Sequence, residues 1–219
     1  MTIRFCVSIL PKTISEALRL FKKAEESHAN FIEVRLDRLE TSGKLADLAQ
    51  GKTPLIATNK SSITQTEREA TLLKAAKSGF EYVDVDISVA KQKSLVDELK
   101  ALGAICIMSS HDPDGSSTLP ELNSTLEKEL ASGADICKIV TTPKRIEDNL
   151  ALLQFVSAAS TKAKVVCFGM GELGKTSRLL SPVFGGFFTF ASLEKGSETA
   201  SGQMTIEEMR TVYSLLGLK

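Results

Sequence analysis

The sequence predicts an α/β protein with the (β/α)8 (TIM) barrel fold, formed by a single domain over residues 1–219. Three observations lead to this prediction. Eight short apolar runs alternate with longer amphipathic patterns, as strands and helices do in βα repeats. No low-complexity segment or evident linker divides the chain. Polar residues of types that carry chemistry follow several of the runs, and in barrels such residues gather at the carboxyl ends of the strands.

The eight apolar runs have the composition of buried parallel strands. They are rich in Val, Ile, Phe and Cys, and polar or turn residues bound each of them. In chain order they are Ile3–Ile9, Phe31–Leu36, Pro54–Thr58, Tyr82–Ile87, Ala104–Ser109, Asp135–Val140, Lys164–Phe168 and Gly186–Ala191.

Amphipathic helical patterns fill most of the intervals. They are centred on Ile14–Phe21, Leu72–Ala76, Leu95–Leu102, Leu119–Leu130, Lys144–Ala158 and Ile206–Leu216. Thr13 or Ser15 is the expected cap of the first helix. Gly103 and Gly133 stand where helix ends favour glycine. Pro143 is expected near the first turn of the Lys144–Ala158 helix.

An open, doubly wound sheet fits the same alternation, and eight units in 219 residues are few residues per unit for a barrel. An open sheet, however, would gather its chemistry at one switch point. Here the polar residues are spread over the ends of many strands, which favours the barrel. They are Ser8, Glu33, Arg35, Asp37, Lys60, His111, Lys138 and Met170.

Charge and composition exclude several classes of partner. The 27 Lys and Arg residues balance the 27 Asp and Glu residues, so no net positive charge attracts nucleic acid. No apolar run is long enough for a transmembrane helix, and the first residues do not form a signal peptide. The cysteines form no CxxC pair, which predicts buried thiols in a reducing cytoplasm and no zinc site. They are Cys6, Cys106, Cys137 and Cys167.

Lys138 stands in the middle of the apolar run Ala134–Val140. Strand alternation places Ile136 and Val140 on the same face as the lysine. A buried ammonium is costly, and its usual response is a lowered pKa. A neutral amine in an apolar site suits Schiff-base chemistry. A lysine that pairs with a neighbouring carboxylate in a purely structural role fits the position equally well.

His111 ends the fifth run, one predicted strand before Lys138. Adjacent strands lie about 5 Å apart, so the two side chains meet if both point into the barrel. An imidazole beside an amine suits proton transfer next to a carbonyl carbon. The alternative is a structural or solvated histidine, which is our interpretation of His28.

Glu33, Arg35 and Asp37 alternate along the second run and share one face. On an exposed antiparallel strand they would form an ordinary solvated face. In a parallel barrel strand they place charge in the interior, which requires pairing or a polar ligand. A Glu/Arg pair of this kind suits a ligand that bears hydroxyl groups.

The segment Gly169–Thr176 satisfies both GxxxxGK[ST] and GxGxxG, and it follows a predicted strand. Nucleotide binding is disfavoured because Pro182 shortens the next helix and the run Gly186–Ala191 offers no Asp for magnesium. The glycines would instead let the loop pass close to a ligand. Arg178 would then supply a fork for a carboxylate, unless it is an ordinary surface residue.

The polar loop Glu194–Gln203 follows the eighth run. It is either a plain connection or a lid over the mouth of the barrel.

Taken in order, these residues resemble the type I 3-dehydroquinate dehydratases of the shikimate pathway. The resemblance runs from Cys6 to Gln203 and rests on the order and spacing of short motifs, each weak alone. They are Cys6–Ile9, Glu33–Asp37, Met108–Asp112, Lys138, Met170–Arg178, Thr189–Phe190 and Thr199–Gln203. The resemblance implies a (β/α)8 barrel, usually a homodimer, that acts on the small molecule 3-dehydroquinate and needs no metal or cofactor.

The resemblance also implies roles for individual residues. Lys138 matches the lysine that forms an imine with the substrate. His111 matches the general acid/base that removes the C2 proton and helps the C1 hydroxyl leave. The contacts to the substrate carboxylate are matched by Arg178, Gln203 and Thr199. The contacts to its ring hydroxyls are matched by Glu33 and Arg35. Ser8, Met170 and Phe190 fall at positions that line the site.

Two regions depart from the family pattern. After the third run many relatives have Thr-x-Arg and then Glu-Gly-Gly, whereas residues 58–64 here carry Lys60, whose ammonium would give the substrate a single-point contact. The glutamate that can orient the histidine has no match, and Asp84 or Asp86 is the expected substitute. Ser201 replaces the usual proline of the final loop, which predicts a more mobile lid.

Two other functions fit part of the sequence. A Schiff-base lyase of the class I aldolase type would use Lys138 on the same barrel but would leave Arg178 without a role. A non-enzymatic nucleotide-binding domain would use Gly169–Thr176.

Overall fold

The strands form one parallel sheet that curves into a barrel. A computed structural model describes residues 2–40, 44–60, 64–115 and 118–218. The eight strands are ordered β7-β6-β5-β4-β3-β2-β1-β8, and every pair is parallel. They are β1 (Phe5–Ile9), β2 (Phe31–Arg35), β3 (Leu55–Thr58), β4 (Tyr82–Asp86), β5 (Ile105–His111), β6 (Ile136–Thr141), β7 (Val165–Gly169) and β8 (Thr189–Ala191).

The two edges of the sheet come together between β7 and the segment that leads into β8. The backbone N–H of Phe187 donates to the carbonyl of Val165 at 2.7 Å. The predicted (β/α)8 barrel is therefore confirmed. The predicted eighth run, Gly186–Ala191, is wrong in extent, because only its last three residues, from Thr189, form a strand.

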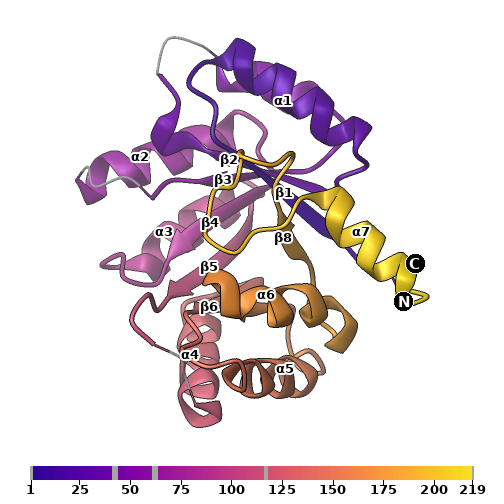
Figure 1. Ribbon diagram of the computed structural model, residues 1–219. Coiled ribbons are helices and arrows are strands. Elements are labelled where there is room, and N and C mark those ends of the chain that lie inside the picture. Colours follow the sequence, from indigo (N-terminus) through magenta and orange to yellow (C-terminus); the bar gives the residue numbers. More distant parts are fainter. Residues whose placement is uncertain (1, 41–43, 61–63, 116–117, 219) are drawn as a thin grey trace.

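Helices surround the barrel (Figure 1). The α-helices are α1 (Ile14–Glu26), α2 (Gln65–Lys77), α3 (Gln92–Ala101), α4 (Leu119–Ala131), α5 (Asp148–Ala159), α6 (Gly171–Leu180) and α7 (Ile206–Leu215). Among the described residues, β2 and β3 are joined by two short 3-10 helices, η1 (Leu36–Arg38) and η2 (Leu45–Gln50), instead of an α-helix. A third, η3 (Ser181–Phe184), follows α6. These short connections let the barrel form from few residues per unit.

The helix boundaries follow the local signals in the sequence. The side chain of Thr13 accepts the backbone N–H of Glu16 at 3.2 Å and so caps α1. Gly103 and Gly133 lie just beyond α3 and α4 with φ of +86° and +92°, a conformation that glycine adopts without strain.

The predicted start of the fifth α-helix is wrong. Its first residue is Asp148, four residues after the predicted Lys144. The Asp148 carboxylate accepts the N–H groups of Lys144 (2.8 Å) and Arg145 (3.0 Å), which stabilises a separate turn. Pro143 instead packs against Gly169, where an added Cβ would lie 2.5 Å from its ring.

The barrel interior has an apolar floor and a polar layer above it. The floor is formed by Cys6, Phe31, Ile56, Ile107, Ile136, Val166 and Phe188. Two residues further along the strands, alternation brings polar side chains to the same inner face. These buried residues are Ser8, Glu33, Thr58, Asp84, Ser109 and Lys138. The barrel therefore concentrates charge in one buried layer near the carboxyl ends of its strands.

A second core lies between the outer faces of the strands and the helices. All four cysteines are buried and free, as predicted. In the described ranges no helix is long and apolar enough to cross a membrane.

Candidate active site

A cavity of about 420 Å³ opens above the polar layer, at the carboxyl ends of the strands. The residues that the sequence analysis assigns to catalysis or substrate binding all line it except Ser8. The lining comprises Glu33, Arg35, Thr58, Lys60, Asp86, His111, Pro113, Lys138, Val140, Phe168, Met170, Arg178, Phe190, Thr199, Ala200 and Gln203. A larger hollow of about 800 Å³ lies outside the barrel and contains none of these residues. We therefore place the candidate active site in the cavity of the barrel.

Lys138 is buried and ion-paired. Its Nζ lies 2.9 Å from Oδ2 of Asp84 and 3.8 Å from Oε1 of Glu33, and it stands 4.4 Å from the centre of the Phe190 ring. Burial favours the neutral amine, but the Asp84 and Glu33 carboxylates outweigh it and raise the pKa of Lys138. Of the two interpretations that the sequence leaves open, the pairing with a carboxylate is found and the lowered pKa is not, because β2 and β4 supply two carboxylates that local sequence does not reveal.

Glu33 is held by two hydroxyl groups from the neighbouring strands. Thr58 Oγ1 on β3 donates to Oε1 at 2.9 Å, and Ser8 Oγ on β1 donates to Oε2. Ser8 is only 1% exposed, and it lies beneath the cavity as a partner of Glu33. The register pairs Ser8 with Glu33 directly, which explains how adjacent parallel strands bring these groups together.

Asp84 is the most shielded carboxylate of the site. Ser109 Oγ donates to its Oδ1 at 2.6 Å, and Lys138 binds its other oxygen. Burial acts to raise the pKa of Asp84, but the Lys138 and Lys60 ammonium groups hold it far below its ordinary value. Asp84 is therefore an anion at ordinary pH, and it lies between two lysines.

Lys60 points into this carboxylate cluster. Its Nζ donates to Asp84 Oδ1 (3.1 Å), to Asp86 Oδ2 (3.1 Å) and to Ser109 Oγ (2.9 Å). Residues 61–63 of the divergent segment lie outside the described residues.

His111 is the last residue of β5 and faces Asp86. Its Nδ1 lies 3.9 Å from Asp86 Oδ2. Burial, together with the positive charges of Lys138 and Lys60, lowers the pKa of His111 to about 3. The imidazole is therefore neutral at ordinary pH and can accept a proton.

Arg35 and Asp37 form a bidentate pair beside the cavity. Arg35 Nε and Nη2 lie 2.9 and 3.0 Å from the two Asp37 carboxylate oxygens. Asp37 lies in η1, beyond the end of β2, so the prediction that it shares the strand face is wrong. The turn after the strand folds Asp37 back onto the guanidinium.

Arg178 is a buried cation without a carboxylate partner among the described residues. It lies on α6 and is 1% exposed, and its guanidinium stands 4.2 Å from the centre of the Phe168 ring. Nη2 donates to the carbonyl of Gly169 at 3.4 Å, whereas Nε has no hydrogen-bond partner there. Burial lowers the pKa of Arg178 to about 10, so it keeps its charge at neutral pH. A guanidinium left in this state at the wall of a cavity is suited to an anionic ligand.

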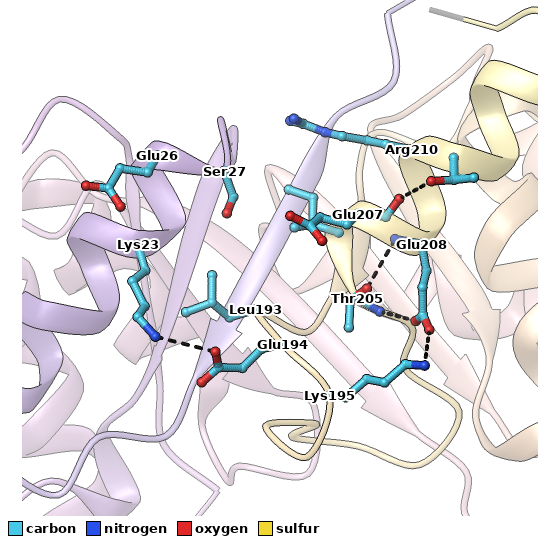
Figure 2. Close-up of a pocket in the computed structure, with 12 residues that line it drawn as sticks. Lys23, Glu26, Ser27, Leu193, Glu194, Lys195, Thr205, Glu207, Glu208 and Arg210 are labelled. Carbon is cyan, nitrogen blue, oxygen red and sulfur yellow. Dashed lines mark hydrogen bonds and ion pairs between the residues drawn. The ribbon is translucent and has the colours of Figure 1, made fainter.

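The loop between β8 and α7 covers part of the cavity with Thr199 and Gln203. These two residues hold each other, because Gln203 Oε1 accepts the N–H of Thr199 at 2.8 Å and Gln203 Nε2 donates to Thr199 Oγ1 at 3.0 Å. Figure 2 shows the base of the loop from outside, where Lys23 pairs with Glu194 and Lys195 with Glu208.

The glycine motif has a packing role in the structure. An added Cβ at Gly174 would lie 2.5 Å from the carbonyl oxygen of Gly169, so the motif lets α6 approach β7. The N–H of Gly171, at the first turn of α6, donates to the carbonyl of Ser201. Lys175 pairs with Glu172 near the surface at 2.7 Å. This geometry argues against nucleotide binding. The loop at Ser201 covers the N-terminus of α6, and Lys175 pairs with Glu172 instead of facing that N-terminus.

Several residues of the site escaped the sequence analysis. Thr58 and Ser109, to which the sequence analysis assigns no role, complete the polar layer. From the sequence, Asp84 or Asp86 is expected only as a substitute for a missing glutamate, and the pairing of Asp84 with Lys138 is not expected. Strand alternation could have identified Thr58 and Ser109, because Thr58 follows Ile56 of the apolar floor by two positions and Ser109 follows Ile107 in the same way.

Fold and site together define a (β/α)8-barrel enzyme that combines a buried lysine–carboxylate centre, a neutral histidine and a buried arginine in one cavity. A family model for type I 3-dehydroquinase matches residues 5–219. A 3-dehydroquinate dehydratase of Dehalococcoides mccartyi is 35% identical over 199 residues, which cover 88% of this chain and 87% of the relative. One of Methanosarcina acetivorans is 30% identical over 229 residues, with 95% and 94% covered.

A solved structure shows the same fold. The crystal structure of 3-dehydroquinate dehydratase from Geobacillus kaustophilus HTA426 has a TM-score of 0.87 at 22% identity and covers 99% of this chain and 92% of that one. The chain belongs to the type I 3-dehydroquinase family, and it is an enzyme of the hydro-lyase class.

Proposed function

We propose that this enzyme converts 3-dehydroquinate to 3-dehydroshikimate and water through an imine on Lys138, as a step of the shikimate pathway. The observation that carries the proposal is the meeting of Lys138, His111 and Arg178 around one cavity. An amine, a base and an anion site are the three groups that this substrate requires, because it carries a ketone, an acidic neighbouring proton and a carboxylate.

The first step is attack of the Lys138 amine on the C3 carbonyl, with loss of water to give a protonated imine. The amine must first lose a proton, and Asp84 Oδ2 is the acceptor within direct reach, at 2.9 Å. The lysine's raised pKa makes this transfer the demanding part of imine formation.

The second step is removal of the C2 proton by His111. The protonated imine draws the electrons of the C2–H bond, so an enamine forms and the neutral imidazole becomes imidazolium. The enamine then expels the C1 hydroxyl, which takes the proton from His111 and leaves as water. Hydrolysis of the new imine consumes one water, frees Lys138 and releases the enone product.

Arg178 holds the substrate carboxylate in this proposal, with Thr199 and Gln203 contributing from the loop. Glu33 and Arg35 bind the ring hydroxyls, and Met170 and Phe190 line the cavity. Ser8 acts through Glu33, to which its hydroxyl donates. The resemblance also implies a substrate contact for Lys60, but its ammonium already donates to Asp84, Asp86 and Ser109, so Lys60 is given no substrate contact in this proposal.

The proposal extends to the whole protein. Residues 1–219 act as one catalytic domain, the enzyme is a cytoplasmic homodimer, and the steps above need no group beyond the substrate and these side chains.

Two variants test the mechanism. Lys138→Ala removes the amine, so neither borohydride trapping of a substrate adduct nor growth of the enone absorbance is expected. His111→Ala keeps the amine, so the adduct is still trapped by mass spectrometry while kcat falls by about 10²- to 10⁴-fold. The exposed Lys22→Met serves as control and should behave as wild type. Full turnover by Lys138→Ala would show that the imine mechanism is wrong.

A further inference from the structure

Lys60 has no hydrogen-bond donor left for a substrate. An ammonium group has three N–H donors, and here protein atoms accept all three. The acceptors are Asp84, Asp86 and Ser109, and the side chain is 24% exposed. A hydroxyl of a bound ring would have to displace one of these bonds.

Asp86 is fixed at both of its oxygens. Ser88 binds Oδ1 through its N–H (3.0 Å) and its Oγ (2.7 Å). Lys60 binds Oδ2 at 3.1 Å, and this is the oxygen that lies 3.9 Å from Nδ1 of His111. The carboxylate is therefore held in one orientation, facing the histidine.

We propose that Lys60 is a positioning residue for His111, and that it acts by holding the Asp86 carboxylate beside Nδ1. This inference rests on the proposed function, in which His111 moves the C2 proton. A carboxylate that faces Nδ1 favours the tautomer with a proton on Nδ1, which leaves Nε2 free to act as the base. The Lys60–Asp86 pair, which comes from the end of β3 and from β4, thus orients the imidazole of His111 in place of a glutamate.

Lys60 also acts on the charge of the site. The titratable groups that face His111 are Lys60 after β3, Asp84 and Asp86 on β4, and Lys138 on β6. The two lysines favour the neutral imidazole and the two carboxylates oppose them. Without Lys60, Asp84 would keep only its ion pair with Lys138, and Asp86 would lose its ion pair with lysine.

The test compares Lys60→Met with Asp86→Asn, with Lys22→Met as a surface control. A positioning role predicts that Lys60→Met lowers kcat by about 10- to 100-fold, leaves KM within about threefold, and still allows borohydride trapping of the imine. Asp86→Asn should lower kcat as well, because an amide can donate to Nδ1 and stabilise the wrong tautomer. The double variant should lose little more than either single variant, since both act through one pair.

The pH dependence separates this role from a merely structural one. Lys60→Met removes a positive charge, so the acid limb of the kcat profile should move upward by about one pH unit. Asp86→Asn removes a negative charge and should not move that limb upward. If Lys60→Met does not fold, Asp86→Asn carries the test alone, because it keeps the Lys60–Asp84 pair.

Two results would overturn the inference. One is a rise in KM of more than about tenfold with kcat unchanged, which identifies Lys60 as a substrate contact. The other is wild-type kinetics in Asp86→Asn. Neither is confused with failure of the proposed function, because in that case the wild-type enzyme itself would give no trapped imine and no enone.

Discussion

Two buried cations face the same cavity in opposite electrostatic surroundings. Lys138 lies against two carboxylates that hold its proton, whereas Arg178 has no carboxylate partner in the described ranges. A buried ion pair is stabilised by its own partners, but an unpaired buried charge destabilises the fold until a ligand arrives. The lysine is therefore arranged for proton transfer and the arginine for binding.

This contrast predicts opposite effects on stability and binding for Arg178→Met. Removal of the unpaired charge should leave the melting temperature unchanged or raise it. Loss of the fork should raise KM for 3-dehydroquinate by about 10- to 100-fold, because hydrogen bonds to charged groups contribute about 1.5–3 kcal/mol. Steady-state kinetics and thermal melting of the same sample check both. A large drop in melting temperature with unchanged KM would mean that Arg178 is structural.

At the scale of elements, the contact of α6 with the loop between β8 and α7 decides where Thr199 and Gln203 lie. Gly202 has φ of +76°, and a Cβ added there would lie 2.1 Å from the carbonyl oxygen of Gly171. The ion pairs at the base of the loop, Lys23–Glu194 and Lys195–Glu208, are exposed and contribute little (Figure 2). Backbone contact with α6 therefore fixes the loop more firmly than these charges do.

Gly202→Ala tests the contact against a matched control in the same loop. Gly196 has φ of +84° and nothing within 4 Å of an added Cβ. Both alanine variants incur the strain of a positive φ, about 1–2 kcal/mol. Only Gly202→Ala should also push the loop from α6 and lower kcat/KM, by about 10- to 100-fold. Equal kinetics in the two variants would contradict the role of this contact.

At the scale of the whole molecule, the sequence predicts the barrel well because its signals are periodic. Alternation identifies the strands, and it places Glu33 and Lys138 on inner faces. Charge partners are harder to predict, since Lys138 meets Asp84 across 54 positions of sequence and the pKa of the lysine depends on that meeting. Pro143 misleads for a related reason, because Asp148 stabilises a turn at the position predicted to begin the helix.

Glu129 is the residue that sequence reasoning missed entirely. It lies on the buried face of α4 with Leu122 and Leu126, at a spacing that normally carries apolar side chains. Its exposure is 0%, and no charged side chain pairs with it in the part of the chain that the structure describes. Burial outweighs the Ser110 hydroxyl, the Cys137 thiol and the Lys138 backbone N–H, which lie near the carboxyl group and act to lower its pKa. Burial raises the pKa of Glu129 from 4.5 to about 9, so the folded protein holds it as a neutral acid.

This group couples the stability of the whole fold to pH. Between about pH 4.5 and 9 the unfolded chain has an ionised Glu129 and the folded chain a protonated one, so the folded state binds more protons. The free energy of unfolding should therefore fall as pH rises, by up to about 1.4 kcal/mol per unit. His111, with its pKa lowered to about 3, acts in the opposite direction, but only up to its ordinary value of 6.5. The window from about pH 7 to 8 isolates Glu129, because it also lies below the ordinary pKa of 9.0 of the four buried cysteines, whose pKa values burial raises.

Denaturant unfolding of Glu129→Gln and wild type across that window measures the effect. The variant cannot ionise, so its stability should stay level while that of wild type falls. Glu127→Gln changes an exposed neighbour on the same helix and should follow wild type. Parallel pH curves for wild type and Glu129→Gln would mean that Glu129 is ionised in the folded protein, and α4 would then have to open to water at neutral pH.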